Sequence, residues 1–183
     1  AAPWLERIEQ SQTLQVCIWP DYYAISYRDP RTSELQGFDI DMARDLAQRL
    51  KVKLEFVDTD FSRFIADLKA ERCAVAMFGI AQTAQRAREV SFTVPTLVGG
   101  IYAITNQAQG ALRRWTDIDQ PGVVVAVQAG TYMEPVMRDY LKHAELLVVQ
   151  APNTREEEVR AGRADVFMTD YPYSQRMLAQ HDW

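Results

Sequence analysis

The residue of this chain best suited to binding a small ligand is an arginine that follows an apolar, strand-like run. Arg86 closes the stretch 79–86 (GIAQTAQR), which begins directly after Phe78. A guanidinium is a planar fork of N–H donors whose spacing matches the two oxygens of a carboxylate. We therefore expect Arg86 to bind a carboxylate group.

Two further groups that could bind ligand charges follow strand-like runs later in the chain. The turn at 128–131 (QAGT) contains Gly130 and Thr131 and precedes a predicted helix, a place that favours anions. Asp170 comes after the apolar run 166–168 and offers a carboxylate that can bind an ammonium group. A carboxylate-binding group and an ammonium-binding group on separate strand ends predict a pocket for an α-amino acid.

Composition and charge exclude several classes of protein. The chain has 183 residues, of which 48% are hydrophobic and 25% charged, which is enough for one sizeable core or two small ones. Its net charge of −5 argues against a nucleic-acid partner. No window is long and apolar enough to span a bilayer. The chain opens with AAPW, and small residues there fit the mature side of a removed export signal.

Strand and helix signals alternate along the chain. In the first half we expect strands over 14–18, 54–57 and 73–78, and helices over 39–50 (capped by Asp39) and 61–70. In the second half we expect strands over 101–105, 123–127, 146–149 and 165–168, and helices over 132–142, 154–161 and 172–178. This alternation is typical of mainly parallel sheets flanked by helices. It predicts two α/β units, 1–100 and 101–183, with a crossover near 97–105.

The candidate ligand groups all fall at the same kind of place in these predicted sheets. Residues 78–79, 128–130 and 169–170 lie at the carboxyl ends of predicted strands. Open α/β sheets bind ligands outside the carboxyl ends of their strands. The strand pattern therefore supports a ligand site built from these segments.

Two cysteines, Cys17 and Cys73, lie in two separate strand-like runs. If those strands are neighbours in a parallel sheet, one internal disulfide is possible, and export to an oxidising compartment would favour it. Two buried thiols that act as small hydrophobic side chains are the alternative.

Four motifs occur in an order that resembles a known family. They are LQGFDIDMA at 35–43, GIAQTAQR followed by VSFT at 79–93, VAVQAGT at 125–131 and AGRADVFMTD at 161–170. Together they resemble the signatures of periplasmic solute-binding proteins of the polar amino-acid type (bacterial extracellular solute-binding proteins, family 3). The resemblance extends from residue 14 to residue 178. It implies the two-lobed, type II "Venus flytrap" fold, whose lobes close over a ligand by a hinge.

The resemblance also implies roles for individual residues. The ligand α-carboxylate is implied to be bound by Arg86 and by the main chain at Ala81, Gly130 and Thr131. The α-ammonium group is implied to be bound by Asp170 and by the carbonyl of Gly79. The residues implied to pack on the ligand body are Tyr22 and Phe61, and Trp19, which departs from the family pattern, would extend them to an aromatic pocket wall. No cofactor and no metal is implied, and we expect His143 and His181 to be solvated.

Three positions depart from the family pattern. Ala81 replaces a serine or threonine and so lacks a hydroxyl donor, Ala74 replaces an aspartate near a strand start, and Trp19 replaces an acid that many cation-binding members carry. An aromatic wall favours an apolar or aromatic ligand side chain, or a cation held over the ring faces. Both ligand types stay open.

The length of the chain also departs from the family. Family members return to the first lobe with a closing strand and final helices, whereas this sequence stops at Trp183. We therefore expect the return to the first lobe to be absent, through truncation, through an omitted tail or through loss of the tail.

The function that these features predict is a periplasmic receptor that takes up an amino acid or similar zwitterion with an ABC transporter. Motifs of serine hydrolases, zinc peptidases and phosphate-binding loops are absent, which predicts a protein that is not an enzyme. Three alternatives remain: a ligand-sensing domain of a membrane signalling receptor, a partner of a periplasmic quinoprotein dehydrogenase, and, least favoured, a prephenate- or arogenate-type dehydratase. In the last case Asp170 would be the proton donor.

Overall fold

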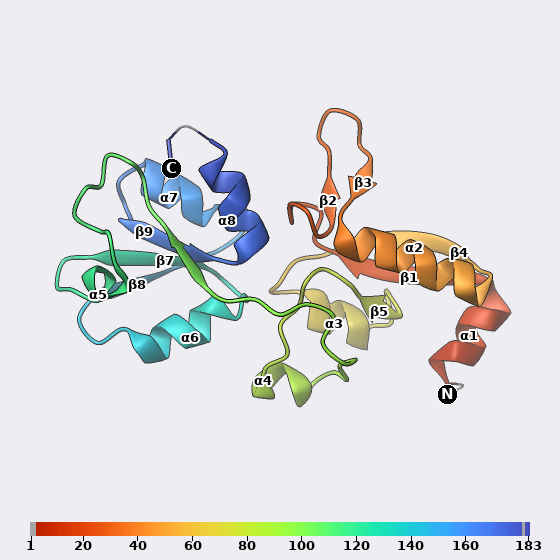
Figure 1. Cartoon of the computed structure of the whole chain (residues 1–183). Helices are drawn as coiled ribbons and strands as arrows, with labels where there is room; N and C mark the ends of the chain where they lie inside the picture. The colour runs from red at the N-terminus through yellow and green to blue at the C-terminus, as the bar shows by residue number, and fades with distance from the viewer. Residues whose placement is uncertain (1–2, 181) are drawn as a thin grey trace. The chain divides into compact units, whose positions relative to one another are not determined.

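The computed structural model describes residues 3–180 and 182–183 (Figure 1). Ala1 and Ala2, on which the expected mature start rests, and His181 lie outside the described residues. The chain forms two compact units, Ala1–Pro95 and Thr96–Trp183, and each has its own sheet and core. We call them unit 1 and unit 2 and describe each by itself.

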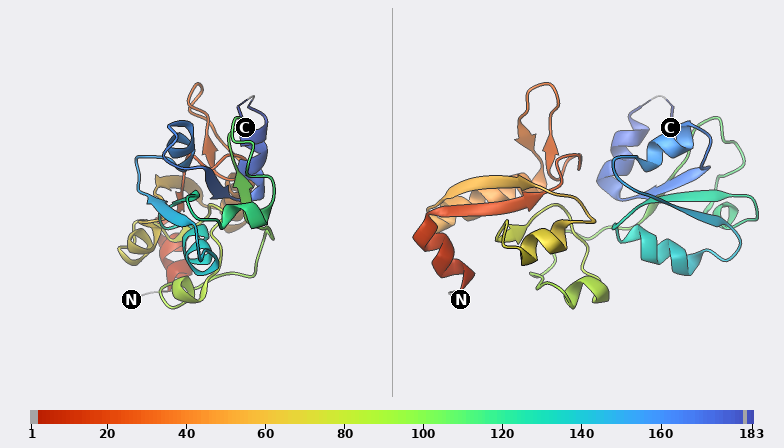
Figure 2. Two further views of the ribbon diagram at one scale, coloured as in Figure 1. Left: turned by 90° about the vertical axis from the view of Figure 1, so that its left-hand side faces the viewer. Right: turned by 180° about the vertical axis from the view of Figure 1, so that it is seen from behind.

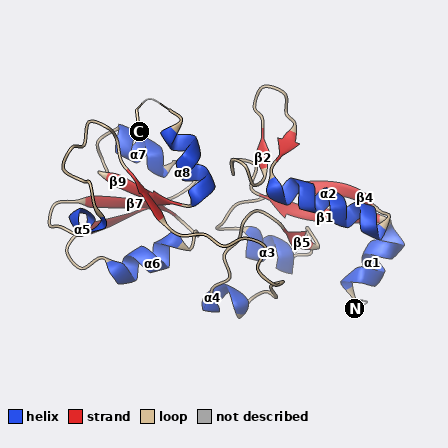
Figure 3. Ribbon diagram, in the orientation of Figure 1, coloured by secondary structure: helices blue, strands red, loops and turns tan. Residues whose placement is uncertain are grey.

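Unit 1 is built on a parallel three-stranded sheet in the order β4-β1-β5 (Figure 3). Its strands are β1 (Thr13–Ile18), β4 (Lys53–Asp58) and β5 (Val75–Ala76), and a small antiparallel hairpin joins β2 (Tyr27–Arg28) to β3 (Leu35–Gln36). Its helices are α1 (Trp4–Ser11), α2 (Phe38–Leu50), α3 (Phe64–Lys69) and α4 (Ala84–Ala87).

The two faces of the unit 1 sheet carry separate cores. On one face the buried stripe of α2, formed by Ile40, Ala43 and Ala47, packs with Leu14 and Val16 of β1. The stripe follows the 3–4 residue spacing of a helix face, which is why this helix could be predicted. On the other face, the α3 residue Phe64 packs in an aromatic cluster that also contains Phe78, the residue that precedes the Arg86 loop.

Two expectations for unit 1 were wrong in detail. The predicted strand over 73–78 is reduced to Val75–Ala76, because the chain turns away at Gly79, whose φ of +65° is left-handed. Asp39 is not the cap of α2: Gly37 holds that position, and the Asp39 carboxylate instead accepts the N–H of Gly79 at 2.6 Å. The hydrogen bond from Gly79 to Asp39 thus connects the loop after β5 to the first turn of α2.

Unit 2 is built on a four-stranded sheet in the order β6-β9-β7-β8. Its strands are β6 (Tyr102–Ile104), β7 (Val124–Gln128), β8 (Glu145–Val149) and β9 (Val166–Thr169), and its helices are α5 (Trp115–Ile118), α6 (Met133–Tyr140), α7 (Arg155–Arg160) and α8 (Tyr171–Leu178). β7 pairs in parallel with β8 and β9, whereas β6 pairs antiparallel with β9. The predicted α/β fold of two units with mainly parallel sheets is thus confirmed.

The helices of unit 2 cover both faces of its sheet (Figure 2). Met133 and Met137 of α6 pack with Val125 and Val127 on one face. α7 and α8 pack together on the other face, over Ala126 and Phe167. The carboxyl ends of β7 and β9 therefore lead into segments that connect to helices on opposite faces.

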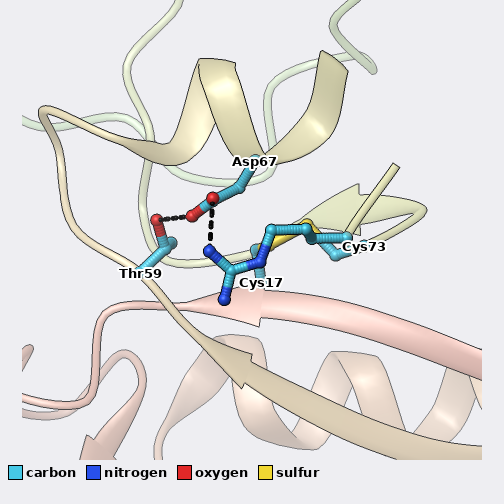
Figure 4. The surroundings of a disulfide bond; sticks show 5 residues. Cys17, Thr59, Asp67 and Cys73 are labelled. Atoms are coloured by element: carbon cyan, nitrogen blue, oxygen red, sulfur yellow. Dashed lines mark hydrogen bonds and ion pairs between the residues drawn. A yellow bond between two sulfur atoms is a disulfide. The ribbon is translucent and has the colours of Figure 1, made fainter. Parts of the chain in front are cut away.

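Cys17 and Cys73 form a disulfide, which is the first of the two alternatives that the sequence left open. β1 and β5 are neighbours in the parallel sheet, and the two Cα atoms lie 5.6 Å apart. Figure 4 shows Thr59 and Asp67 beside the bridge; the Thr59 hydroxyl donates to the Asp67 carboxylate at 2.6 Å. The disulfide thus ties the segment just before the short edge strand β5 to the central strand of unit 1.

None of the helices formed by the described residues is long and apolar enough to cross a membrane.

Candidate functional site

Arg86 is the centre of the candidate site in unit 1. It lies on the short helix α4, which begins after Thr83, whose Oγ1 accepts the Arg86 backbone N–H at 3.1 Å. Only 6% of Arg86 is exposed, and its Nη1 donates to the carbonyl of Ala81 at 2.8 Å. Burial lowers the pKa of Arg86, but an arginine starts so high that the guanidinium stays charged at neutral pH.

Aromatic rings surround this guanidinium and extend the site. Its Cζ lies 5.5 Å from the ring centroid of Phe64 and 5.8 Å from that of Phe61. Phe61 in turn makes edge contacts with Trp19 at 5.5 Å and with Tyr22 at 6.0 Å between centroids. The structure therefore brings together the arginine and the three aromatic residues that the sequence singled out.

The main chain beside the aromatic cluster is held by two close contacts. A Cβ added to Gly79 would lie 3.2 Å from the ring of Tyr22, so a larger residue there would press on the ring. The Gly79 N–H is held by Asp39, a buried carboxylate whose pKa is raised by burial and lowered in part by this hydrogen bond. The sequence did not predict Asp39 as a support of the site, although its position within the GFDID motif was an available signal.

Ala81 lies against Arg86 in a way that the sequence did not predict. Its carbonyl accepts a hydrogen bond from the guanidinium, so one role of this residue is to orient the arginine. The N–H contact to a ligand that the resemblance implied for Ala81 stays a prediction.

In unit 2, the predicted anion-binding turn follows β7 as expected. The hydroxyl of Thr131 donates to the carbonyl of Gln128 at 2.7 Å, and Thr131 is buried. The N–H of Gly130 donates to a carboxylate oxygen of Glu134 at 3.2 Å. The turn therefore does bind a carboxylate, but one supplied by the first turn of α6.

Asp170 is the N-cap of α8. Its Oδ1 accepts the backbone N–H of Tyr173 at 2.8 Å, as capping aspartates do. The same carboxylate acts on Tyr132, whose pKa is raised first by burial and then by the negative charge of Asp170. Asp170 thus lies near Tyr132, which directly follows the Gly130–Thr131 turn, at the carboxyl edge of the unit 2 sheet.

A second buried arginine, Arg155, lies at this edge and was missed by sequence analysis. It is 4% exposed, and its Nη2 donates to the hydroxyl of Thr169 at 2.9 Å. The sequence predicted a helix over 154–161, but nothing in the run REEE at 155–158 indicates that Arg155 points inward.

Within the described part of the chain, no group of three or more histidine, cysteine, aspartate or glutamate side chains could hold a metal ion. His143 is exposed on the surface of unit 2.

Comparison with known proteins supports the resemblance. The family model of the bacterial extracellular solute-binding proteins, family 3, matches residues 14–140. A cyclohexadienyl dehydratase of Pseudomonas aeruginosa is 36% identical over 91% of this chain and 62% of its own length. A histidine-binding periplasmic protein of Salmonella typhimurium is 26% identical over 87% of this chain and 61% of its own. The chain thus spans about three-fifths of these relatives.

A solved structure agrees with the fold. The ancestral amino acid-binding protein AncCDT-1, described as a precursor of cyclohexadienyl dehydratase, matches with a TM-score of 0.87 and 32% identity. The match covers 97% of this chain and 79% of that one.

The first of these relatives corrects one expectation. The absence of hydrolase, zinc and phosphate-loop motifs predicted that the protein is not an enzyme, but a relative at 36% identity is a dehydratase. Those motifs do not detect a dehydratase, because such an enzyme needs a placed proton donor rather than a nucleophile, a metal or a phosphate loop. A single carboxylic acid leaves no spacing signature in a sequence.

Proposed function

Because the chain belongs to the bacterial extracellular solute-binding proteins of family 3, we propose that it binds a small amino-acid-like ligand through its α-carboxylate and α-ammonium groups. The observation that carries this proposal is Arg86, a buried guanidinium held against aromatic rings in unit 1. For the ammonium group we propose Asp170 of unit 2, the role that the family resemblance implies for it. The finer role that we propose is capture of this ligand outside the cytoplasm for ABC-type uptake.

The physical basis is the match between the site groups and a zwitterion. A guanidinium presents a bidentate donor fork, and desolvation strengthens its attraction for a carboxylate. The rings of Trp19, Tyr22 and Phe61 offer an apolar wall for the ligand body. The missing hydroxyl at Ala81 leaves Arg86 with a larger share of the carboxylate recognition.

A thermal-shift screen against the common L-amino acids tests this proposal. A ligand that binds only the folded state at a hundredfold excess over its Kd stabilises the protein by about 2.7 kcal/mol. We expect a shift with one class of amino acid, loss of that shift in Arg86→Ala, and its retention in Arg88→Ala, an exposed arginine at the end of the same helix. An unchanged shift in Arg86→Ala would refute the proposal.

A second candidate function is favoured by the similarity to cyclohexadienyl dehydratase. In this case the same carboxylate-binding site holds a cyclohexadienyl acid. A carboxylic acid protonates the departing hydroxyl group, which leaves as water, while the bond to the ring carboxylate breaks, releases CO2 and supplies the electron pair that makes the ring aromatic. Asp170 is the donor that we infer, since it lies at the sheet edge where ligands bind in this fold class. Incubation with prephenate, followed by the absorbance of phenylpyruvate, tests it; activity that persists in Asp170→Asn would exclude this donor.

A further inference from the structure

Three tyrosines of unit 2 lie around Asp170, and the proposed function has not used them. We propose that the rings of Tyr102 and Tyr171, with Tyr132 beside them, form a cation-binding surface next to the Asp170 carboxylate, and that this surface takes an ammonium group whose nitrogen carries methyl groups. The inference deepens the role proposed for Asp170 and rests on it. All four residues belong to unit 2, so the surface is complete within one compact unit.

Strand pairing and the start of a helix bring the first two rings together. Tyr102 is the first residue of β6 and is paired with Thr169, the last residue of β9. Asp170 follows Thr169 as the N-cap of α8, and Tyr171 is the first residue of that helix. The ring centroids of Tyr102 and Tyr171 lie 5.6 Å apart, with their planes tilted by 56°. The rings thus meet at the carboxyl end of β9, where ligands of open α/β sheets bind.

Tyr132 reaches the same place from another element. It is the N-cap residue of α6, and its hydroxyl donates to the carbonyl of Gly100 at 3.3 Å. Burial is the first cause that raises the pKa of Tyr132, and the charges of Asp170 and Tyr102 raise it further. Because the effect of one charge on another falls with distance, the Tyr132 hydroxyl lies near both of these groups. Tyrosines from three elements thus gather around one carboxylate.

The tyrosine pair is open to solvent. Tyr102 is 41% exposed, Tyr171 is 53% exposed, and Asp170 is partly exposed. By contrast, Tyr173 further along α8 is buried, and its hydroxyl donates to the carboxylate of Glu156. The exposed part of each ring is therefore available to a solute together with the Asp170 carboxylate.

The chemistry of this surface favours a methylated ammonium group. The face of an aromatic ring carries negative charge density and attracts a cation held over it. A primary ammonium group has three N–H donors that need acceptors when the group leaves water, and ring faces replace those acceptors poorly. A methylated nitrogen has fewer donors to satisfy, or none. Asp170 adds the opposite charge, while its Oδ1 already accepts the N–H of Tyr173.

Three small probes test this inference with the full chain. Choline carries a trimethylammonium group, ethanolamine carries a primary ammonium group in its place, and the uncharged carbon analogue of choline carries a tert-butyl group there. None of these probes has a carboxylate, so their binding does not depend on Arg86. In NMR titrations of wild type we expect choline to shift the tyrosine ring signals and to bind about threefold or more tightly than either of the other probes.

Two substitutions at Tyr171 separate the ring from its hydroxyl. Tyr171→Leu removes the ring and should weaken choline binding about two- to fivefold, the range of a cation–π contact at an exposed site. Tyr171→Phe keeps the ring and should bind choline as wild type does. Tyr102→Leu should act like Tyr171→Leu, so the result does not depend on the folding of one variant. Tyr140→Leu removes another exposed tyrosine of unit 2, whose ring contacts Trp115, and should change nothing.

Choline bound by wild type no more tightly than its uncharged analogue or than ethanolamine would overturn the inference. Choline affinity that is unchanged in both leucine variants at Tyr102 and Tyr171 would overturn it too. Either result leaves the role of Arg86 intact, because the thermal-shift screen tests that role separately. An absence of any shift in that screen would refute the proposed function, and a choline preference would then still support the tyrosine surface.

Discussion

At the scale of single residues, each unit contains a buried arginine. Arg86 and Arg155 are both buried, and each has aromatic rings around its guanidinium. The sequence predicted Arg86 because it closes a recognisable motif after a strand. It did not predict Arg155, because the direction of a side chain at the start of a helix depends on packing that local pattern does not encode.

Asp39 leads to a prediction about pH. Burial raises its pKa, so ionisation of this carboxyl costs more in the folded state than in the unfolded chain. That cost is absent below the unfolded pKa of about 3.9 and complete once the pH exceeds the raised folded value. Asp39→Asn keeps an oxygen that can accept the Gly79 N–H but carries no charge. We therefore expect the variant to gain stability relative to wild type as the pH rises from about 4 to 7.

Urea unfolding of both proteins across this pH range measures the effect. Asp41→Asn, which changes an exposed residue in the first turn of the same helix, is the matched control and should not reproduce it. A stability difference between Asp39→Asn and wild type that is independent of pH would contradict the assigned cause.

At the scale of elements, the short strand β5 is the part of unit 1 that most needs support. It pairs with β1 through only Val75 and Ala76, yet it leads to the loop that carries Gly79 and Arg86. The disulfide at Cys73 and the hydrogen bond from Gly79 to Asp39 hold the segment before and after this strand. Alternation of strand and helix signals predicted the order of the main elements. The same alternation predicted a longer strand than β5, because the chain after Ala76 is held by contacts between residues distant in sequence and not by strand pairing.

Removal of the disulfide should destabilise the protein. The bridge joins residues 56 positions apart, and a constraint of that kind typically contributes about 2–4 kcal/mol. We expect the double variant Cys17→Ala/Cys73→Ala to lose stability in this range in chemical unfolding. Wild type treated with reductant should fall to a similar value, whereas the double variant should not respond to it. A double variant that is as stable as untreated wild type would contradict a structural role for the bridge.

Gly79 should tolerate a side chain less well than another left-handed glycine. Gly79→Ala places a methyl group 3.2 Å from Tyr22 at φ +65°, whereas Gly162→Ala at φ +75° meets no atom within 4 Å. The left-handed conformation alone costs a non-glycine residue about 1–2 kcal/mol. We expect Gly162→Ala to lose about that much in urea unfolding, and Gly79→Ala to lose more. Equal losses would show that the contact with Tyr22 contributes nothing.

At the scale of the whole molecule, the chain consists of two compact units with separate cores. The last residues of unit 1 and the first residues of unit 2 expose apolar side chains, with Val94 81% and Val98 98% exposed. An exposed segment with few contacts is where proteases cut folded chains. We therefore expect elastase, which cleaves after small apolar residues, to cut first within 94–100. Mass spectrometry of the fragments would reveal this, and a first cut inside β1 or β7 would contradict it.

The central claim is that Arg86 binds the carboxylate of a small amino-acid-like ligand. Calorimetric titration of the best ligand from the thermal-shift screen into wild type, Arg86→Ala and Arg88→Ala tests this claim most directly. We predict that affinity falls by about a hundredfold in Arg86→Ala, as expected for a lost charge-assisted hydrogen bond, and stays at the wild-type value in Arg88→Ala. An Arg86→Ala protein that is folded and binds this ligand as tightly as wild type would contradict the account.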